Sequence, residues 1–128
     1  MNCDTQQITI EVERDELFEF LSNPENMAKW ATGICSGVRQ VGDEWVAETM
    51  MGDVKLKMVS DKELGVIDYH ILPPVPVQIA LYCRVLKNNL GSEFIVSYFQ
   101  IPILPNFEAQ KKMVTKAINK LKEIAESM

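Results

Sequence analysis

The sequence predicts an α+β domain in which a curved antiparallel sheet of about seven strands lies against one long C-terminal helix. Residues 106–128 repeat their apolar side chains at helical spacing, whereas most of residues 33–101 reads as β-strands. Two short helical segments follow the first strand. Helices grouped beside an antiparallel sheet are typical of α+β proteins. The 128 residues are sufficient for a single domain, 1–128, with a core that needs no disulfide or metal.

The N-terminal segment predicts one strand followed by two short helices. Residues 6–12 alternate between apolar and polar side chains, which is the period of a half-buried strand. Residues 14–21 instead place their apolar side chains at helical intervals. Asn23 and Pro24 then suit the cap and first turn of a second short helix that ends near Trp30.

The middle of the chain predicts strands joined by short turns. Gly-Asp at 52–53 is a two-residue hairpin signal. A turn there pairs Met51 with Val54 and brings Glu48 opposite Lys57. The hairpin then separates into an apolar inner face and a more polar outer face, which supports this register.

The later strands predict an inner face that is apolar and aromatic. A four-residue turn at 61–64 places Tyr69 inward, but a turn one residue shorter reverses the two faces. Residues 77–86 and 93–101 form two long strands around a turn, with Tyr98 on their inner face. The sequence leaves open whether three polar residues face a cavity or solvent: Asp68, His70 and Arg84.

The C-terminal helix has one apolar stripe and one lysine-rich surface. Asn106 suits its cap, and at ~1.5 Å per residue the helix is roughly 30 Å long. The stripe must be covered, and the sheet is its natural cover. The apolar positions are Met113, Val114, Ala117, Ile118, Leu121, Ile124, Ala125 and Met128. The lysines are Lys111, Lys112, Lys116, Lys120 and Lys122.

Charge and composition exclude several classes of partner. The net charge is −5, and residues 1–105 carry eight basic against fifteen acidic side chains, which argues against nucleic-acid binding. The lysine-rich helix surface fits either a solvated face or contact with an acidic partner or a membrane surface. No segment has the ~18 apolar residues of a membrane span.

Three cysteines without CxxC spacing, in a sequence without a recognisable secretion signal, favour reduced thiols and a cytoplasmic location. Cys83 suits a small core residue of an apolar strand.

The sequence carries no motif for metal, nucleotide or phosphate chemistry. His70 is the one histidine, so a His-rich metal site is excluded, and we expect no metal and no cofactor. Acid–base catalysis would have to use polar side chains of the predicted sheet. The candidates are Asp68, Tyr69, His70, Tyr82, Arg84 and Tyr98.

The inward-facing side chains favour a ligand cavity between the sheet and the long helix. Ligand cavities are mostly apolar and aromatic with a few polar groups, and methionine adapts to irregular ligand shapes. The alternative is that these side chains fill each other's space and form a packed core. The predicted lining residues are Trp30, Trp45, Thr49, Met58, Tyr69, Tyr98, Phe107, Met113 and Ile118, with Trp30 and Phe107 near the mouth.

The order of elements resembles the helix-grip superfamily of START, polyketide cyclase/dehydrase and birch-pollen-allergen-like domains. The matching residues are the strand Ile8–Val12, the segment Glu13–Trp30 with its Asn-Pro-Glu turn, Gly91-Ser92-Glu93 and the terminal helix. The chain closely resembles small bacterial members. The resemblance implies binding of a lipid, quinone or polyketide-like molecule, and it transfers no catalytic residue.

Three functions therefore follow as expectations. The leading one is a cytoplasmic, non-enzymatic binding protein for a hydrophobic small molecule. The second is a cyclase- or dehydrase-like enzyme that uses Tyr69, His70, Arg84 or Tyr98. The third is a protein-interaction module, such as a homodimer, whose exposed face carries Val46, Met50, Val59, Ile95 and Phe99.

Overall fold

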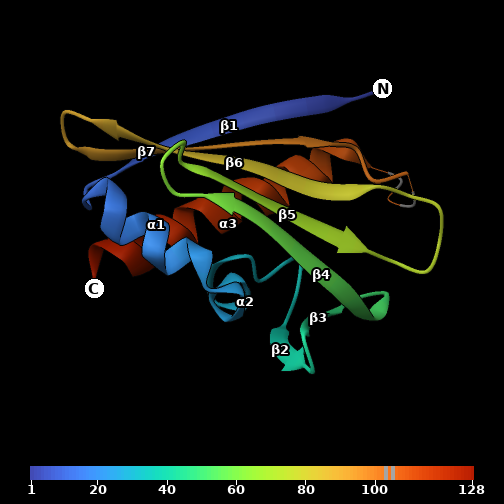
Figure 1. Cartoon of the computed structure of the whole chain (residues 1–128). Helices are drawn as coiled ribbons and strands as arrows, with labels where there is room; N and C mark the ends of the chain where they lie inside the picture. Colours follow the sequence, from blue (N-terminus) through green and yellow to red (C-terminus); the bar gives the residue numbers. More distant parts are fainter. Residues whose placement is uncertain (103, 105) are drawn as a thin grey trace.

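A computed structural model, which describes residues 1–102, 104 and 106–128, confirms the α+β prediction (Figure 1). Within these residues, seven strands form one antiparallel sheet, two short helices follow the first strand, and the last element is a long helix. The elements are β1 (Cys3–Ile10), α1 (Arg14–Ser22), the 3₁₀ turn η1 (Pro24–Asn26), α2 (Met27–Trp30), β2 (Gly37–Val41), β3 (Glu44–Thr49), β4 (Gly52–Asp61), β5 (Val66–Leu72), β6 (Ile79–Asn88), β7 (Gly91–Phe99) and α3 (Phe107–Glu126).

The sheet order is β1-β7-β6-β5-β4-β3-β2, so every pair of neighbours except β1 and β7 is consecutive along the chain. The first strand therefore pairs with the last one, β7, and α3 is the element that follows β7 in the chain. Figure 1 shows α3 crossing behind the sheet toward the C-terminus, which lies near α1, whereas α2 lies beside the middle of α3. The three helices and the inner face of the sheet enclose the core.

The inner faces of β5, β6 and β7 are those that the sequence predicts. Asp61 pairs with Val66, which leaves four residues in the turn and places Tyr69 inward. The inward apolar side chains of these strands are buried, whereas Val77, predicted to start a strand, precedes β6 and is half-buried. The buried side chains are Ile67, Tyr69, Ile71, Ile79, Leu81, Cys83, Val85, Phe94, Val96 and Tyr98.

The register of the β3–β4 hairpin differs from the prediction. The turn consists of residues 50–51, so Thr49 pairs with Gly52 and Ala47 pairs with Val54 instead of Met58. The side chain of Thr49 explains the choice, because its hydroxyl accepts from the Met51 N–H at 3.1 Å and donates to the Gly52 carbonyl at 3.0 Å. The shift is an even number of residues, so the inner face keeps the same side chains.

The predicted Glu48–Lys57 pair is replaced by an arginine bridge. Glu48 lies opposite Asp53, and two facing carboxylates repel each other. Arg39 of the neighbouring strand donates to both, at 3.2 Å to Glu48 and 2.6 Å to Asp53. Arg39 of β2 thus offsets the repulsion between Glu48 of β3 and Asp53 of β4. The predicted register avoids this repulsion, because it pairs Glu48 with Lys57.

The first strand begins and ends earlier than predicted, at Cys3 and Ile10. The chain turns away at Val12, whose carbonyl accepts from the Ser92 hydroxyl at 2.6 Å. Gly91 permits this close approach, because an added Cβ would lie 2.7 Å from the Val12 nitrogen. Gly91 also has a φ of +142°, which side chains disfavour. The Gly91-Ser92 pair therefore anchors the junction between β1 and α1.

The helix α3 begins where predicted, with the Asn106 side chain accepting from the Ala109 N–H at 3.3 Å. Its buried face holds Val114, Ala117, Ile118, Leu121 and Ala125 together with the polar Gln110. At the edge of the predicted apolar stripe, Met113 and Ile124 are half-buried and Met128 is exposed. No helix in the described part of the chain combines the length and apolarity needed to cross a membrane.

Candidate functional site

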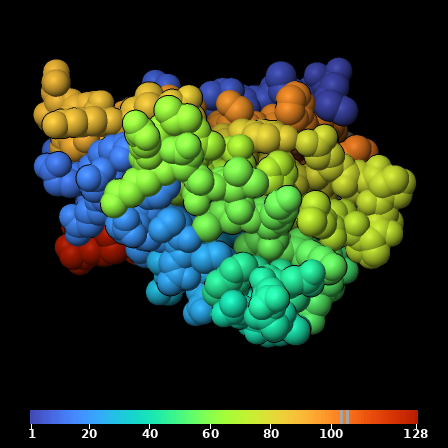
Figure 2. All heavy atoms as spheres, viewed as in Figure 1, coloured from blue at the N-terminus to red at the C-terminus, as the bar shows by residue number. Residues whose placement is uncertain are grey.

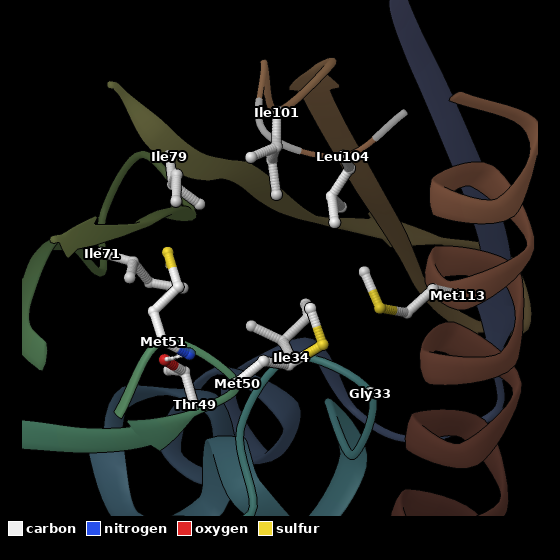
Figure 3. A pocket seen from close by; sticks show the side chains of 10 residues that line it. All are labelled: Gly33, Ile34, Thr49, Met50, Met51, Ile71, Ile79, Ile101, Leu104 and Met113. Carbon is white, nitrogen blue, oxygen red and sulfur yellow. Dashed lines mark hydrogen bonds between the residues drawn. The ribbon is translucent and has the colours of Figure 1, made fainter. Parts of the chain in front are cut away.

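An apolar pocket lies at the end of the sheet where β5 ends and β6 begins (Figure 3). Its walls come from the loop after α2, the β3–β4 hairpin, the facing ends of β5 and β6, the segment after β7, and α3. The lining residues are Gly33, Ile34, Thr49, Met50, Met51, Ile71, Ile79, Ile101, Leu104 and Met113. None of these side chains is titratable, so the pocket offers contact surface rather than acid–base groups.

The pocket is small in this conformation. Its volume is about 60 Å³, whereas pockets for drug-sized ligands measure roughly 300–1,000 Å³. The space fits a few atoms of an apolar chain. A larger ligand requires the lining side chains to move.

Three of the lining side chains are methionines, which can change conformation at a small cost in free energy. Met50 and Met51 come from the β3–β4 turn and Met113 from α3, and the Met50 side chain is 80% exposed. Figure 3 shows the Met51 and Met113 side chains pointing into the hollow from opposite walls. Methionine has three rotatable bonds and no branch point, so it refills an altered space with little strain. The methionines therefore form an adjustable part of the wall.

Gly33 fixes where the Met113 side chain lies. A Cβ at Gly33 would be 2.6 Å from Met113 Cγ and 3.0 Å from its sulfur. The methionine thus lies directly against the backbone of the loop, in space that any other residue at position 33 would occupy. Glycine at position 33 therefore leaves the space in which the Met113 side chain lies.

Thr49 is the one lining residue with a polar side chain, and its hydroxyl is already used. It makes both hydrogen bonds of the β3–β4 turn described above. A ligand in the pocket therefore meets an apolar wall on all sides formed by the described residues.

The structure brings two of the nine predicted lining residues, Thr49 and Met113, to this pocket. Four others are buried in the core away from it: Trp30, Tyr69, Tyr98 and Ile118. Phe107 is half-buried and packs against the Tyr98 ring at 6.2 Å. Trp45 and Met58 are half-buried and border a separate shallow hollow beside Leu56 and Leu72.

Trp30 lies in the centre of the core, not at the mouth where the sequence suggested. It is 1% exposed, and its ring packs edge-on against Tyr69 at 6.0 Å and Phe94 at 5.8 Å. Its indole N–H has no hydrogen-bond partner among the described residues. Packing of the large ring thus outweighs an unsatisfied donor, which costs about 1–3 kcal/mol.

The two inward tyrosines have their hydroxyls occupied. Tyr69 donates to the Leu21 carbonyl at 2.9 Å, and burial raises its pKa well above the ordinary value. Tyr98 donates to the Asp4 carboxylate at 2.6 Å; burial and, next in size, this hydrogen bond raise the pKa of Tyr98. Both groups stay protonated near neutral pH and serve as structural hydrogen-bond donors.

The other acid–base candidates lie on the outer face of the sheet. His70 packs edge-on against Tyr82 at 5.8 Å, and Asp68 and Arg84 share that face. Tyr82 also packs against Phe99 at 6.5 Å. The sheet therefore separates His70 and Arg84 from Tyr69 and Tyr98, so these four groups form no common site. The use of this outer face by a partner or a second copy stays a prediction.

The cysteines are three free thiols in two environments. Cys3 is exposed, whereas Cys35 and Cys83 are buried. Burial raises the pKa of Cys35 to about 11 and that of Cys83 well above its usual value, so both remain neutral thiols. Cys83 is the core residue that the sequence predicts. Among the described residues, no cluster of three or more His, Cys, Asp or Glu side chains is arranged to hold a metal ion.

Most lining residues of the pocket were not anticipated, because they lie where elements end. Periodicity placed Ile71 and Ile79 on the inner face but gave no sign that this neighbouring pair borders a hollow. Ile34 and Leu104 lie in loops, where no period exists. The adjacent pair Met50-Met51 beside Gly52 was the one local signal, since apolar side chains are unusual in a turn.

Comparison with solved structures identifies the architecture. A protein from Bacillus halodurans superimposes with a TM-score of 0.75 at 9% identity, covering 98% of both chains. XoxI from Bacillus cereus gives 0.72 at 13% identity, covering 98% of this chain and 96% of that one. Ara h 8.0201 gives 0.68 at 14% identity, covering 99% of both. The chain adopts the helix-grip fold.

The helix-grip assignment concerns architecture alone, because these identities are too low to carry function. The sequence matches no protein-family model and no curated protein. The function must therefore be argued from the pocket and its surroundings.

Proposed function

We propose that this helix-grip protein binds a hydrophobic small molecule, of a lipid, quinone or polyketide-like kind, without transforming it. The observation that carries the proposal is the apolar pocket with three methionines at the open end of the sheet. The resemblance to ligand-binding helix-grip domains supports the same interpretation.

The chemistry of the pocket favours binding over catalysis. Catalytic acids and bases must lie within hydrogen-bond reach of the reacting group. No titratable side chain belongs to the described lining of the pocket, and Thr49 uses its hydroxyl in a turn. Contact with apolar surface is the interaction that these residues offer, at about 25 cal/mol per Å² buried.

The small volume implies that the ligand enters by displacing methionine side chains. Met113 and Met51 point into the hollow from opposite walls, and Met50 is largely exposed at its edge. Rotation of these side chains requires no change in the sheet or in α3. We therefore expect binding to depend strongly on the size of residue 113.

Two substitutions at position 113 test the proposal with an uncharged fluorescent probe, N-phenyl-1-naphthylamine. Met113→Ala removes the end of the side chain and enlarges the hollow, so we expect severalfold tighter probe binding. Met113→Trp fills the hollow, so we expect affinity to fall by about tenfold, or ~1.4 kcal/mol. The measurement is a fluorescence titration of each variant.

Met58→Ala is the matched control, because Met58 is a half-buried methionine outside the pocket. Its probe affinity should remain close to that of the unsubstituted protein. If the Met113→Trp variant binds the probe as tightly as the unsubstituted protein, the pocket is not the binding site. Native mass spectrometry of the purified protein then identifies any ligand that it carries.

A further inference from the structure

The lysines of α3 form a stripe that the pocket does not explain. Lys112, Lys116 and Lys120 follow one another at intervals of four residues, so they lie on one side of the helix. All three are exposed and border a surface groove that also includes Thr32 of the loop after α2. We call these three residues the lysine stripe. It is a concentrated positive surface on a chain whose net charge is −5.

Most of this positive charge is not neutralised within the protein. Lys120 lies 3.7 Å from the Glu123 carboxylate, which is an exposed pair. Lys112 and Lys116 have no carboxylate within ion-pair distance among the described residues. By contrast, Lys111 and Lys122 on other sides of the helix pair with Glu108 and Glu126. The stripe thus retains two cations for an external partner.

The lysine stripe adjoins one wall of the pocket. Lys112 precedes Met113, and Thr32 precedes Gly33, so the groove and the pocket share the wall between α3 and the loop. Two exposed apolar side chains lie in connections between lining residues, and we call them the apolar rim. The Met50 side chain is 80% exposed, and Val75, in the connection between the two lining residues Ile71 and Ile79, is 46% exposed.

We propose that the lysine stripe and the apolar rim dock this protein on an anionic lipid bilayer, with the pocket opening toward the lipid. The inference deepens the proposed function and rests on it, since it names the source from which a hydrophobic ligand enters. Each lysine near an anionic surface strengthens binding by about fivefold, while exposed apolar side chains enter the interface.

The pairing of the two features favours a bilayer over other polyanions. A nucleic acid or an acidic protein would use the lysines but leaves Met50 and Val75 in water. A bilayer uses both, because its surface is charged and its interior is apolar. Figure 2 shows one face of the molecule, on which β4, β5 and β6, in green and yellow, lie beside the short helices in blue and the β2–β3 region in cyan.

Vesicle flotation tests the proposal with the full chain. The unsubstituted protein should float with phosphatidylcholine vesicles that contain phosphatidylglycerol, should not float with pure phosphatidylcholine, and should be released by high salt. The double variant Lys112→Glu with Lys116→Glu should bind at least about tenfold more weakly. Met50→Ser should weaken binding at unchanged charge.

The matched control is Lys57→Glu with Lys87→Glu, which changes net charge equally. Both lysines are exposed in β4 and β6 and have no ion-pair partner among the described residues. Circular dichroism establishes that both double variants are folded. Equal loss of flotation in the two double variants, or no flotation of the unsubstituted protein, overturns the proposal.

Probe binding in vesicle-free solution separates this inference from the proposed function. The stripe variant should bind N-phenyl-1-naphthylamine as the unsubstituted protein does, because Lys112 and Lys116 do not line the pocket. Vesicle binding without any probe binding would refute the proposed function but leave the docking surface. Probe binding without selective vesicle binding would refute the docking surface alone.

Discussion

Tyr98 connects the edge strand β1 to the core through one hydroxyl. It donates to Asp4 at 2.6 Å and accepts from the Gln6 amide at 2.8 Å. Gln6 in turn accepts from Thr115 of α3 at 2.8 Å. The hydrogen bond from Tyr98 is the main cause that lowers the pKa of Asp4. The Tyr98 hydroxyl therefore joins β7 to β1 through Asp4, and to α3 through the Gln6 amide.

Tyr98→Phe should destabilise the protein by about 1–3 kcal/mol at neutral pH, because Asp4 and Gln6 lose a partner. A carboxyl whose folded pKa is lowered adds stability above its unfolded pKa of about 3.9, and that stability disappears as pH falls through the folded value. The difference between the two proteins should therefore shrink below about pH 4. Urea unfolding at neutral and acidic pH measures it.

Tyr82→Phe is the control for that comparison. The Tyr82 hydroxyl lies on the outer face and accepts from the Gln78 side chain at 2.8 Å, with no carboxylate. Its removal should cost little and should show no change in acid. An acid-independent loss at Tyr98 would assign the effect to packing and not to Asp4.

At the scale of elements, Gln110 holds the β7–α3 connection in place. Its side-chain oxygen accepts from the Ile101 N–H at 3.0 Å, and its amide donates to the Phe99 carbonyl at 2.9 Å. Gln110 is buried on a face that is otherwise apolar. It therefore supplies the hydrogen bonds that the strand loses where β7 ends, next to the pocket residue Ile101.

Gln110→Leu should destabilise the protein by about 1–3 kcal/mol, since two buried backbone groups lose their partner. It should also speed the amide hydrogen exchange of Ile101. The exposed Asn119→Leu on the same helix serves as control and should change stability by less than about 0.5 kcal/mol. Equal behaviour of the two variants would mean that the connection is held by other contacts.

The elements themselves were largely predictable from sequence, but their details were not. The predictions from the apolar intervals of α3 and from the alternation around Tyr69 and Phe94 are confirmed, because both patterns reflect which side chains must be buried. The β3–β4 register depended instead on the hydroxyl of Thr49, which no periodicity reports. The role of Gln110 could not be predicted for the same reason, since its partners lie where β7 ends and regular structure stops.

The pocket was less predictable than the fold for a geometric reason. Aromatic residues such as Trp30 and Tyr69 are large, so they fill the centre of the core. The hollow remains at the end of the sheet, where smaller side chains from loops and turns meet. A sequence period identifies the inner face of a strand. It does not show where along the strand the inward side chains no longer fill the space up to the facing loops and helix.

At the scale of the molecule, Trp30 joins the helical layer to the sheet. It belongs to α2, and its ring contacts Tyr69 of β5 and Phe94 of β7. Because these two strands lie on either side of β6, one side chain fixes the distance between α2 and the middle of the sheet. The unsatisfied N–H is tolerated in return for that contact.

Trp30→Ala should destabilise the protein by about 3–5 kcal/mol, because the core cannot collapse around so large a void. Trp45→Ala is the control, since Trp45 is half-buried in β3, next to the edge strand β2. Its loss should cost clearly less. Chemical denaturation with near-ultraviolet circular dichroism compares them, and similar losses would remove Trp30 from its central role.

The contact between Gly33 and Met113 has a consequence for how this architecture can diversify. The methionine rests in a place that exists because position 33 lacks a side chain. A single methyl group added at position 33 would displace the Met113 side chain and so alter the hollow that it lines. Capacity is thus governed by a surface loop, so related chains could acquire different cargo sizes while the strands and the long helix stay unchanged.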